Sequence, residues 1–326
     1  MKLTAFLLLW SSCLAFSATE EQINTNFSVA PGGTLVVNVD FGSITVSTNA
    51  TSGVTVDVWR KVGRKTEAKE REFLRDYPVR FTRDGATVTV RAEHHDSDGW
   101  FWSSWRGWYQ NEAQYTIHVP AQFNVQLETR GGGISVSDIA ANTRANTSGG
   151  GLSFTRLHGP LNGNTSGGGI RVADCDGALK IHTSGGGIAV TGGSGTLDGD
   201  TSGGPVDVKN FHGDTHFRTS GGGITIENVV GEIEGFTSGG GVSAVLPSPL
   251  VHAVDLSTSG GGVTVRVPDN AAFNLDAVTS GGGVSSELPV TVAGQLDYGH
   301  LQGAVNGGGP TVRLRSSGGS IQVKKF

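Results

Sequence analysis

The chain has 326 residues, with 24 Lys and Arg against 29 Asp and Glu, so its formal net charge is −5 at neutral pH. This slightly acidic balance excludes a basic surface of the kind that binds nucleic acid or an anionic membrane. The chain is long enough for one sizeable core or two small domains. Its 52 glycines far exceed the usual share of about 7%.

Residues 1–17 predict a secretory signal peptide. One cation, Lys2, precedes a mostly apolar run over 3–16, which is too short for a bilayer-spanning helix of about 20 residues. Ala15 and Ser17 provide the small residues expected before a cleavage site. We therefore expect an exported protein, in the periplasm, on the outer cell surface or outside the cell, with no transmembrane span once the signal is removed.

The tetrapeptide Trp10-Ser11-Ser12-Cys13 leaves a second possibility open. Small residues before a cysteine are similar to a bacterial lipobox, and Cys13 would then carry a lipid anchor. If cleavage follows Ser17 instead, Cys175 is the only cysteine left. An internal disulfide is then impossible, so the stability must come from the core.

Residues 18–128 predict a smaller β-rich segment with one short helix. Residues 64–76 have helical character, because Glu67 and Arg71 are spaced to pair at i, i+4. We expect this helix to lie across the end of the domain that follows. Asp84-Gly85 fits a hairpin turn. Strands are expected, from alternating apolar residues, over 34–39, 43–48, 54–59, 79–83 and 87–93.

A Thr-Ser-Gly-Gly-Gly turn, or a close variant of it, recurs from Thr129 to the end of the chain. Its Thr returns every 18 residues and then twice after 21 residues, and degraded copies follow at Val305 and Ser316. A fixed period of this length indicates a solenoid. The intact Thr positions are 129, 147, 165, 183, 201, 219, 237, 258 and 279.

Each unit reads as two short strands. Apolar residues at its sixth and eighth positions enclose a polar one, which is the pattern of a strand with one buried face. Glycine at the thirteenth position marks a corner, and the fifteenth position is again often apolar. Stacking such units about 4.8 Å apart gives every backbone group a partner. Residues 129–326 therefore predict an all-β fold, a β-solenoid (a single-stranded, right-handed β-helix) of about eleven coils with about 18 residues per coil.

Four further expectations follow from this register. The glycines allow positive φ and close approach between coils, and the Thr and Ser hydroxyls can form ladders up the stack. The extra residues of the longer units should bulge at a corner, where Pro247, Pro249 and Pro268 occur. The parity of the Thr position places its side chain inside, which argues against an ice-binding Thr face.

The repeated TSGGG-[IVL]-x-V motif, behind a signal peptide and a strand-rich segment, resembles a bacterial family of candidate adhesins built from β-strand repeats, a family largely of unknown function. The resemblance extends from about Phe41 to the C-terminus. It implies a β-solenoid and an adhesin-like envelope protein that is not an enzyme. No catalytic residue is carried over with it.

Residues 94–109 form an aromatic segment that holds four of the six tryptophans. Exposed Trp and Tyr can stack on sugar rings, insert at a membrane interface or anchor a protein partner. The same residues could instead form a cap that buries the first coil. The binding candidates are Trp100, Phe101, Trp102, Trp105, Trp108 and Tyr109.

We expect no metal and no cofactor. His94 and Asp96 are the most that one strand can bring to one face there, and two ligands do not make a site. Cys175 stands where other units have Leu, Phe or Val, so it should be a buried apolar residue.

The sequence as a whole favours an exported adhesin-like or structural envelope protein. It would bind an envelope protein or a polysaccharide through the aromatic segment and the solenoid side-chain ladders. The alternative is a polysaccharide-acting enzyme of the β-helix type, for which Asp174, Asp176 and His212 are the first candidates. A third reading is end-to-end stacking of coils into filaments.

Overall fold

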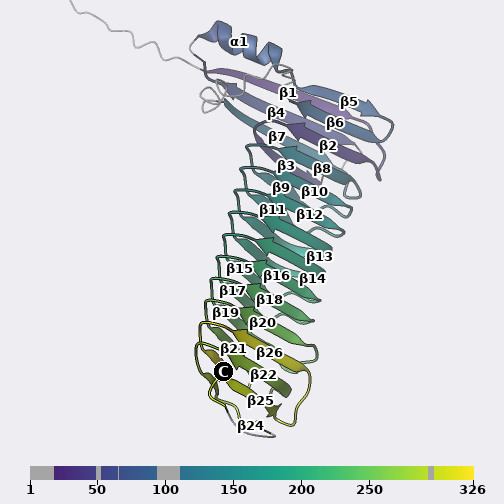
Figure 1. Cartoon of the computed structure of the whole chain (residues 1–326). Coiled ribbons are helices and arrows are strands. Elements are labelled where there is room, and N and C mark those ends of the chain that lie inside the picture. The colour runs from purple at the N-terminus through teal and green to yellow at the C-terminus, as the bar shows by residue number, and fades with distance from the viewer. Residues whose placement is uncertain (1–17, 49–52, 65, 94–110, 293–296) are drawn as a thin grey trace, which may run out of the picture.

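The computed structural model of the chain describes residues 18–48, 53–64, 66–93, 111–292 and 297–326. These residues form a tall stack of β-coils with one helix at its N-terminal end (Figure 1). The all-β solenoid with 18 residues per coil is confirmed: Leu161 pairs with Leu179, and Ile170 pairs with Ile188, on directly neighbouring strands.

Each coil gives one strand to each of two parallel ladders, which we call sheet 1 and sheet 2. The strands of sheet 1 end at or near the repeated Thr, and those of sheet 2 follow the glycine turn. Sheet 1 contains β2 (Thr34–Val39), β6 (Thr87–Ala92), β8 (Asn124–Thr129), β10 (Thr143–Thr147), β12 (Leu161–Thr165), β16 (Thr215–Thr219), β18 (Ile233–Thr237), β20 (Val254–Thr258), β22 (Phe273–Thr279) and β26 (Thr311–Ser316). Sheet 2 contains β3 (Ser43–Thr48), β7 (Asn111–Val119), β9 (Ile134–Ser137), β11 (Leu152–Thr155), β15 (Val206–Lys209), β17 (Ile224–Glu227), β19 (Val242–Val245), β21 (Val263–Val267), β23 (Val284–Ser286) and β27 (Ile321–Lys325).

Two long strands join the ladders at the middle of the stack. β13 (Ile170–Thr183) and β14 (Ile188–Thr201) run from sheet 2 through the corner into sheet 1. The inward residues of both sheets form one continuous apolar core. Large and small residues alternate within it: a Cβ on Gly163 would lie 2.9 Å from the ring of Phe154. That glycine therefore makes room for a buried aromatic ring.

The repeated Thr is buried, as its parity predicts, so no Thr face is presented to solvent. Its hydroxyl does not form the expected hydroxyl ladder. The Thr147 Oγ1 instead donates to the carbonyl oxygen of Gly132 in the preceding coil (2.7 Å) and accepts from the Gly150 amide (3.3 Å). Each Thr thus ties its own glycine turn to the turn before it.

The middle glycine of each turn is required by contact between coils. A Cβ on Gly150 would lie 2.1 Å from the Gly132 carbonyl oxygen, whereas one on Gly149 would find its nearest neighbour at 3.5 Å. In the longer unit that follows Thr237, the extra residues lie between β19 and β20 at a corner, as predicted. Ile233 still pairs with Val254, so the register survives the insertion.

At the N-terminal end the coils are stacked out of sequence order. The β2–β3 coil lies between β6–β7 on one side and β8–β9 on the other. Val39 pairs directly with Thr129, so the parallel ladder is continuous across residue 129. β5 (Arg80–Asp84), β4 (Val54–Val62) and β1 (Thr19–Phe27) then add antiparallel strands outside β6 and β7.

The β5–β6 hairpin turns at Gly85-Ala86, one residue later than expected. Gly85 has a φ of 55°, a conformation that a glycine adopts without a steric penalty. Asp84 and Thr87, on either side of this turn, are the last cross-strand pair of the hairpin, and their pairing sets the position of the turn.

The helix α1 (Glu67–Asp76) lies across this end of the stack (Figure 1). It begins later than residue 64 because Thr66 is its N-cap, and Glu67 pairs with Arg71 as predicted. The buried Glu70 fixes it, since the carboxylate accepts from the Thr19 amide and hydroxyl (3.0 and 2.6 Å) and from the Arg64 amide (2.8 Å).

The C-terminal end repeats the out-of-order stacking. The last coil in the sequence, β26–β27, is inserted between β20–β21 and β22–β23. Ser316 replaces the repeated Thr and donates to the Gly261 carbonyl oxygen (2.8 Å). The expected copy at Val305 is wrong, because Val305 ends β25 (His300–Val305), which runs antiparallel to β22 and to β24 (Val290–Thr291). The stack therefore has one coil fewer than the degraded motifs suggest.

Candidate binding site on sheet 1

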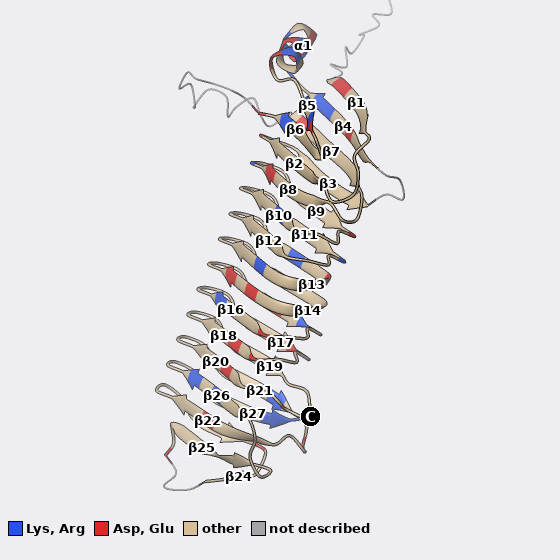
Figure 2. Ribbon diagram, turned by 90° about the vertical axis from the view of Figure 1, so that its right-hand side faces the viewer, with Lys and Arg blue, Asp and Glu red and all other residues tan. Residues whose placement is uncertain are grey.

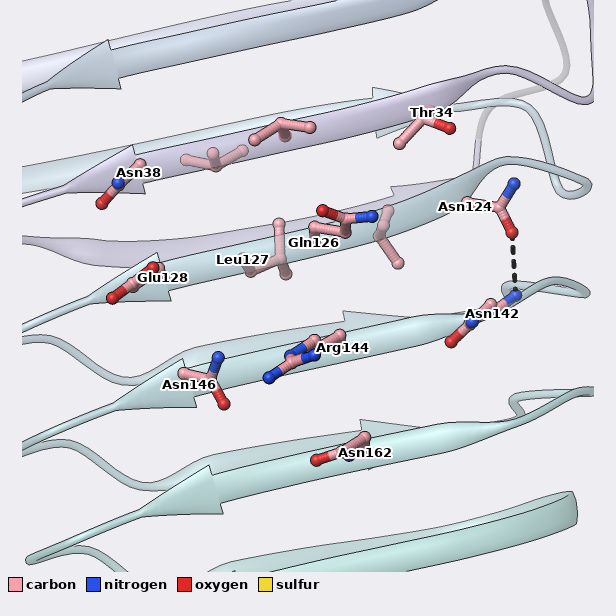
Figure 3. Close-up of a pocket in the computed structure, with 13 residues that line it drawn as sticks. Thr34, Asn38, Asn124, Gln126, Leu127, Glu128, Asn142, Arg144, Asn146 and Asn162 are labelled. Carbon is pink, nitrogen blue, oxygen red and sulfur yellow. Dashed lines mark hydrogen bonds between the residues drawn. The ribbon is translucent and has the colours of Figure 1, made fainter.

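A groove of about 610 Å³ lies on the outer surface of sheet 1 near the helix-bearing end (Figure 3). It crosses four neighbouring strands, β2, β8, β10 and β12. Because side chains alternate along a strand, every second residue of these strands faces outward into the groove. Its outward side chains are mostly amides: Asn38, Asn124, Gln126, Asn142, Asn146 and Asn162, with Thr34, Val36, Glu128 and Arg144.

The register aligns these side chains in rows along the stack. Asn38 pairs with Glu128, which is followed by Asn146 and Asn164 on the next strands. The Asn164 Nδ2 donates to the Asn146 Oδ1 (3.0 Å) and to the Asn162 Oδ1 (2.7 Å). These hydrogen bonds join neighbouring coils and hold the amides in fixed orientations.

Other amides of the groove keep their hydrogen-bonding capacity. Among the described residues, the side chains of Asn38, Gln126 and Asn142 have no hydrogen-bond partner, although the Asn124 Oδ1 accepts from the Asn142 backbone amide (3.3 Å). Each free amide offers two donors and one carbonyl acceptor. The groove can therefore both donate to and accept from an uncharged polar ligand.

Further along sheet 1 the same rows become ionic. His216 pairs with Glu234 (2.8 Å). At the C-terminal end Asp276 accepts two hydrogen bonds from Arg315 (3.0 and 2.8 Å) and faces Arg313 and His300. Hydrogen bonding by Arg315 holds the pKa of the Asp276 carboxyl below its ordinary value. These charges bind one another across coils, which distinguishes this region from the amide groove.

The first enzyme candidates lie at the corner where each coil passes from sheet 2 to sheet 1, opposite the Thr-Ser-Gly-Gly-Gly turn. Asp176 accepts from the Ser194 hydroxyl (2.7 Å), and its other oxygen lies 2.9 Å from the His158 Nδ1. The hydrogen bond from Ser194, followed by that from His158, lowers the pKa of Asp176. The carboxylate stands between the Ser194 hydroxyl and the His158 imidazole. His212 follows Ser194 on the next coil, but among the described residues it makes no hydrogen bond to the Ser194 hydroxyl, whereas activation of a serine needs an imidazole in that place. This row joins neighbouring coils and does not form a nucleophile.

The remaining sequence candidates divide into two groups. Cys175 is fully buried, as predicted, and burial raises the pKa of its thiol. Trp100, Phe101, Trp102, Trp105, Trp108 and Tyr109 lie outside the described residues, as do Cys13 and the pair His94 and Asp96.

The described residues contain neither a cluster of metal ligands nor a membrane-spanning helix. No group of three or more His, Cys, Asp or Glu side chains among them could hold a metal ion. No helix in the same part of the chain has the length and apolar character needed to cross a membrane.

The amide groove was not predicted from the sequence. Its Asn residues recur at equivalent positions of successive units, but two of its four strands precede the first clear repeat. Only the pairing of Val39 with Thr129 places Asn38 next to Glu128. A search for amides at fixed repeat positions, extended upstream by five periods, would have found the row.

Comparisons with known proteins place the chain in a family. No curated protein matches it. Similar solved structures include a candidate cell adhesion protein from Clostridium sporogenes (10% identity, covering 95% of this chain and 100% of that one, TM-score 0.23) and a candidate adhesin from Bacteroides fragilis (12%, 94% and 97%, TM-score 0.33). A candidate adhesin from Parabacteroides distasonis is also similar (12%, 93% and 97%, TM-score 0.35). The Toastrack DUF4097 family model matches residues 34–324, and the chain belongs to this family.

Proposed function

We propose that this chain is an exported, adhesin-like binding protein without enzymatic activity, and that it holds a polysaccharide in the amide groove of sheet 1. The single observation that carries the proposal is the row of outward amides on β2, β8, β10 and β12. Sugar hydroxyls both donate and accept, and side-chain amides match them in both roles. Only two of the outward side chains, Glu128 and Arg144, are charged. Sugar hydroxyls that bind the amides would therefore remove little water from charged groups of the protein.

The geometry suits a long ligand. The groove runs across strands whose spacing is about 4.8 Å, so equivalent groups recur along the stack and can engage successive units of a polymer. Each contact is exposed and therefore weak, on the order of 1 kcal/mol. Affinity would come from many such contacts made along one chain, as in multivalent binding.

The aromatic segment can contribute to the same site. It follows β6 in the sequence, and Arg91 of β6 pairs with Asn38 of the groove; its candidate residues are Trp100, Phe101, Trp102, Trp105, Trp108 and Tyr109. Aromatic rings stack on sugar rings. A signal peptide over residues 1–17 would deliver the protein to the cell envelope, where such polymers occur.

The test is glycan binding by the purified protein. We would titrate a panel of neutral polysaccharides and peptidoglycan fragments by calorimetry, with wild type and a triple variant in which Asn38→Ala, Gln126→Ala and Asn142→Ala remove the free amides. We expect at least a tenfold loss of affinity in the triple variant for a glycan that the wild type binds. Gln322→Ala, an outward amide of sheet 2 at the far end, is the matched control and should bind normally.

Two outcomes would contradict the proposal. Equal binding by the triple variant and wild type would remove the groove from the site. Cleavage or elimination of a polysaccharide by the wild type, lost on Asp176→Asn, would replace a binding protein with an enzyme.

A further inference from the structure

Two arginines lie side by side on the outer surface of sheet 1, next to the amide groove. Arg80 on β5 and Arg91 on β6 are direct cross-strand partners in an antiparallel pair, so both side chains point to the same face. Both are exposed. Figure 2 shows this end of the stack with basic segments on β4, β5 and β6.

Neither arginine is neutralised within the described part of the chain. No ion pair joins Arg80 or Arg91 to a carboxylate among those residues, although Asp84 lies on β5 itself and Glu93 follows β6. Like charges that face each other directly across two strands destabilise a sheet. Three other arginines at this end are paired: Arg60 with Glu21, Arg71 with Glu67 and Arg75 with Asp76. Arg83 of β5 has no carboxylate partner among the described residues, but its side chain donates to the Gly85 carbonyl oxygen.

The arginine pair continues a row of the groove. Arg80 pairs with Arg91, and Arg91 pairs with Asn38, which is itself a groove residue. Glu128 and Asn146 follow on the next strands. One file of side chains therefore starts with two cations and passes into amides, with Asn38 separating Arg91 from the carboxylate of Glu128.

We infer that the arginine pair is an anion subsite, and that the ligand of the groove is an acidic polysaccharide whose sugar carboxylate lies between Arg80 and Arg91. The inference rests on the proposed function, because it names the class of glycan for the same groove. Guanidinium groups bind carboxylates in a planar, bidentate manner. A carboxylate there would relieve the repulsion between the cations, while the neutral hydroxyls of neighbouring sugars meet the amides.

The charges of the groove place the acidic group of such a ligand. Glu128 and Arg144 both line the groove, so its own charges balance and the surplus positive charge lies at the arginine pair. The sugar carboxylate therefore belongs over Arg80 and Arg91, and the rest of the glycan extends toward Asn146. The protein as a whole is slightly acidic. Recognition of an acidic glycan therefore has to come from a local pair of cations and not from the overall charge.

The experiment compares acidic and neutral glycans. Oligogalacturonate, a chain of sugars that each carry a carboxylate, and a neutral dextran of similar length would be titrated into the full protein. We expect wild type to bind oligogalacturonate more tightly, with an affinity that falls as salt is raised. Arg80→Gln with Arg91→Gln should weaken oligogalacturonate binding at least tenfold and leave dextran binding unchanged.

The matched control is Arg71→Gln with Arg75→Gln, which removes the same charge from α1 at the same end. It should bind oligogalacturonate within about twofold of wild type. The melting temperature of the Arg80 and Arg91 double variant should not fall, because the substitution removes a repulsion. Equal losses in both double variants would indicate a general charge effect and overturn the subsite.

The outcomes separate this inference from the proposed function. If the amide variant loses glycan binding while the Arg80 and Arg91 variant binds oligogalacturonate like wild type, the groove stands and the anion subsite fails. If only the arginine variant loses binding, the subsite stands and the amide groove fails. Binding to vesicles containing an anionic phospholipid, lost in the arginine variant while oligogalacturonate never binds, would assign the pair to a lipid phosphate and overturn the inference.

Discussion

The middle of the stack and its two ends are made of the same kind of coil, but the coils are connected in different orders. In the middle, each coil lies on the one that precedes it in the sequence, as Leu161 on Leu179 shows. At the N-terminal end β2–β3 lies inside β6–β7, and at the C-terminal end β26–β27 lies inside β22–β23. The first and last coils in sequence are therefore interior layers.

Sequential stacking in the middle and interleaved stacking at the ends stabilise the solenoid in two different ways. A middle coil contacts only its two neighbours, so its stability is close to a sum of equal local terms. An end coil in sequential order would be free to fray. Here each outermost coil lies against a coil from a distant part of the sequence. The antiparallel strands β4 and β25 also pair with β7 and β22, the last strands of the parallel ladders.

The largest effect should come from removing the inserted coil. Deleting residues 306–326 takes away the strands that pair with β20, β21, β22 and β23 at once. We expect the C-terminal end to unfold and the protein to lose several kcal/mol, a large share of a typical total of about 5–15 kcal/mol. Chemical denaturation and hydrogen exchange, resolved along the chain, would measure it.

Deleting one middle repeat is the comparison for that truncation. Removing residues 148–165 keeps the 18-residue register and takes out Phe154 together with the Gly163 that accommodates its ring. We expect a folded protein with a smaller loss of stability, because one repeat and one interface are removed and both ends remain intact. A larger loss from this deletion than from the truncation would contradict the interleaved-end account.

The next effect concerns the close contact between neighbouring turns in the middle. Gly150→Ala places a Cβ 2.1 Å from the Gly132 carbonyl oxygen, whereas Gly149→Ala meets its nearest neighbour at 3.5 Å. Overpacking against a rigid backbone should cost about 2–3 kcal/mol in the first variant, and the second should lose less than about 1 kcal/mol. Similar urea midpoints for the two variants would show that the turn can relax.

These examples indicate what the sequence can predict. The period, the inward Thr and the buried Cys175 all follow from one register, because strict stacking repeats each environment in every coil. The interleaved ends do not follow from it. The insertion of β26 between β20 and β22 depends on long-range pairing among strands that all carry the same apolar pattern, and nothing local in Ser316 or its glycines selects those partners. The amide groove was missed for the same reason.

A smaller effect should come from the hydroxyl that ties two turns. Thr183 is fully buried and donates to the Gly168 carbonyl oxygen (2.7 Å) while accepting from the Gly186 amide (3.2 Å). Thr183→Val keeps the shape and leaves both groups unpaired, which should cost about 1–2 kcal/mol. Thr183→Ser keeps the hydroxyl, as Ser316 does naturally, and should retain most of the stability. Equal losses for Val and Ser would assign the effect to packing of the methyl group.

The smallest effect tests the charges that hold the inserted coil. Arg313 of β26 lies 3.2 Å from Asp255 on β20 and 3.6 Å from Asp276 on β22, so it bridges both neighbours. Hydrogen bonding by Arg315 lowers the pKa of Asp276 in the folded protein. A lowered pKa contributes stability above the unfolded value of about 3.9, and this stability is lost as the pH falls through the folded value.

We therefore expect Asp276→Asn to cost about 0.5–1 kcal/mol at pH 7 and progressively less below pH 4, as measured by urea unfolding across pH. Asp207→Asn removes a carboxylate that has no ion pair among the described residues, and its difference from wild type should stay small throughout. If the Asp276 difference persisted undiminished at pH 2, the carboxylate would be acting through shape and not charge. The charge of Asp276 would then contribute nothing to holding the inserted coil, and the strand pairing of β26 and β27 would carry that role.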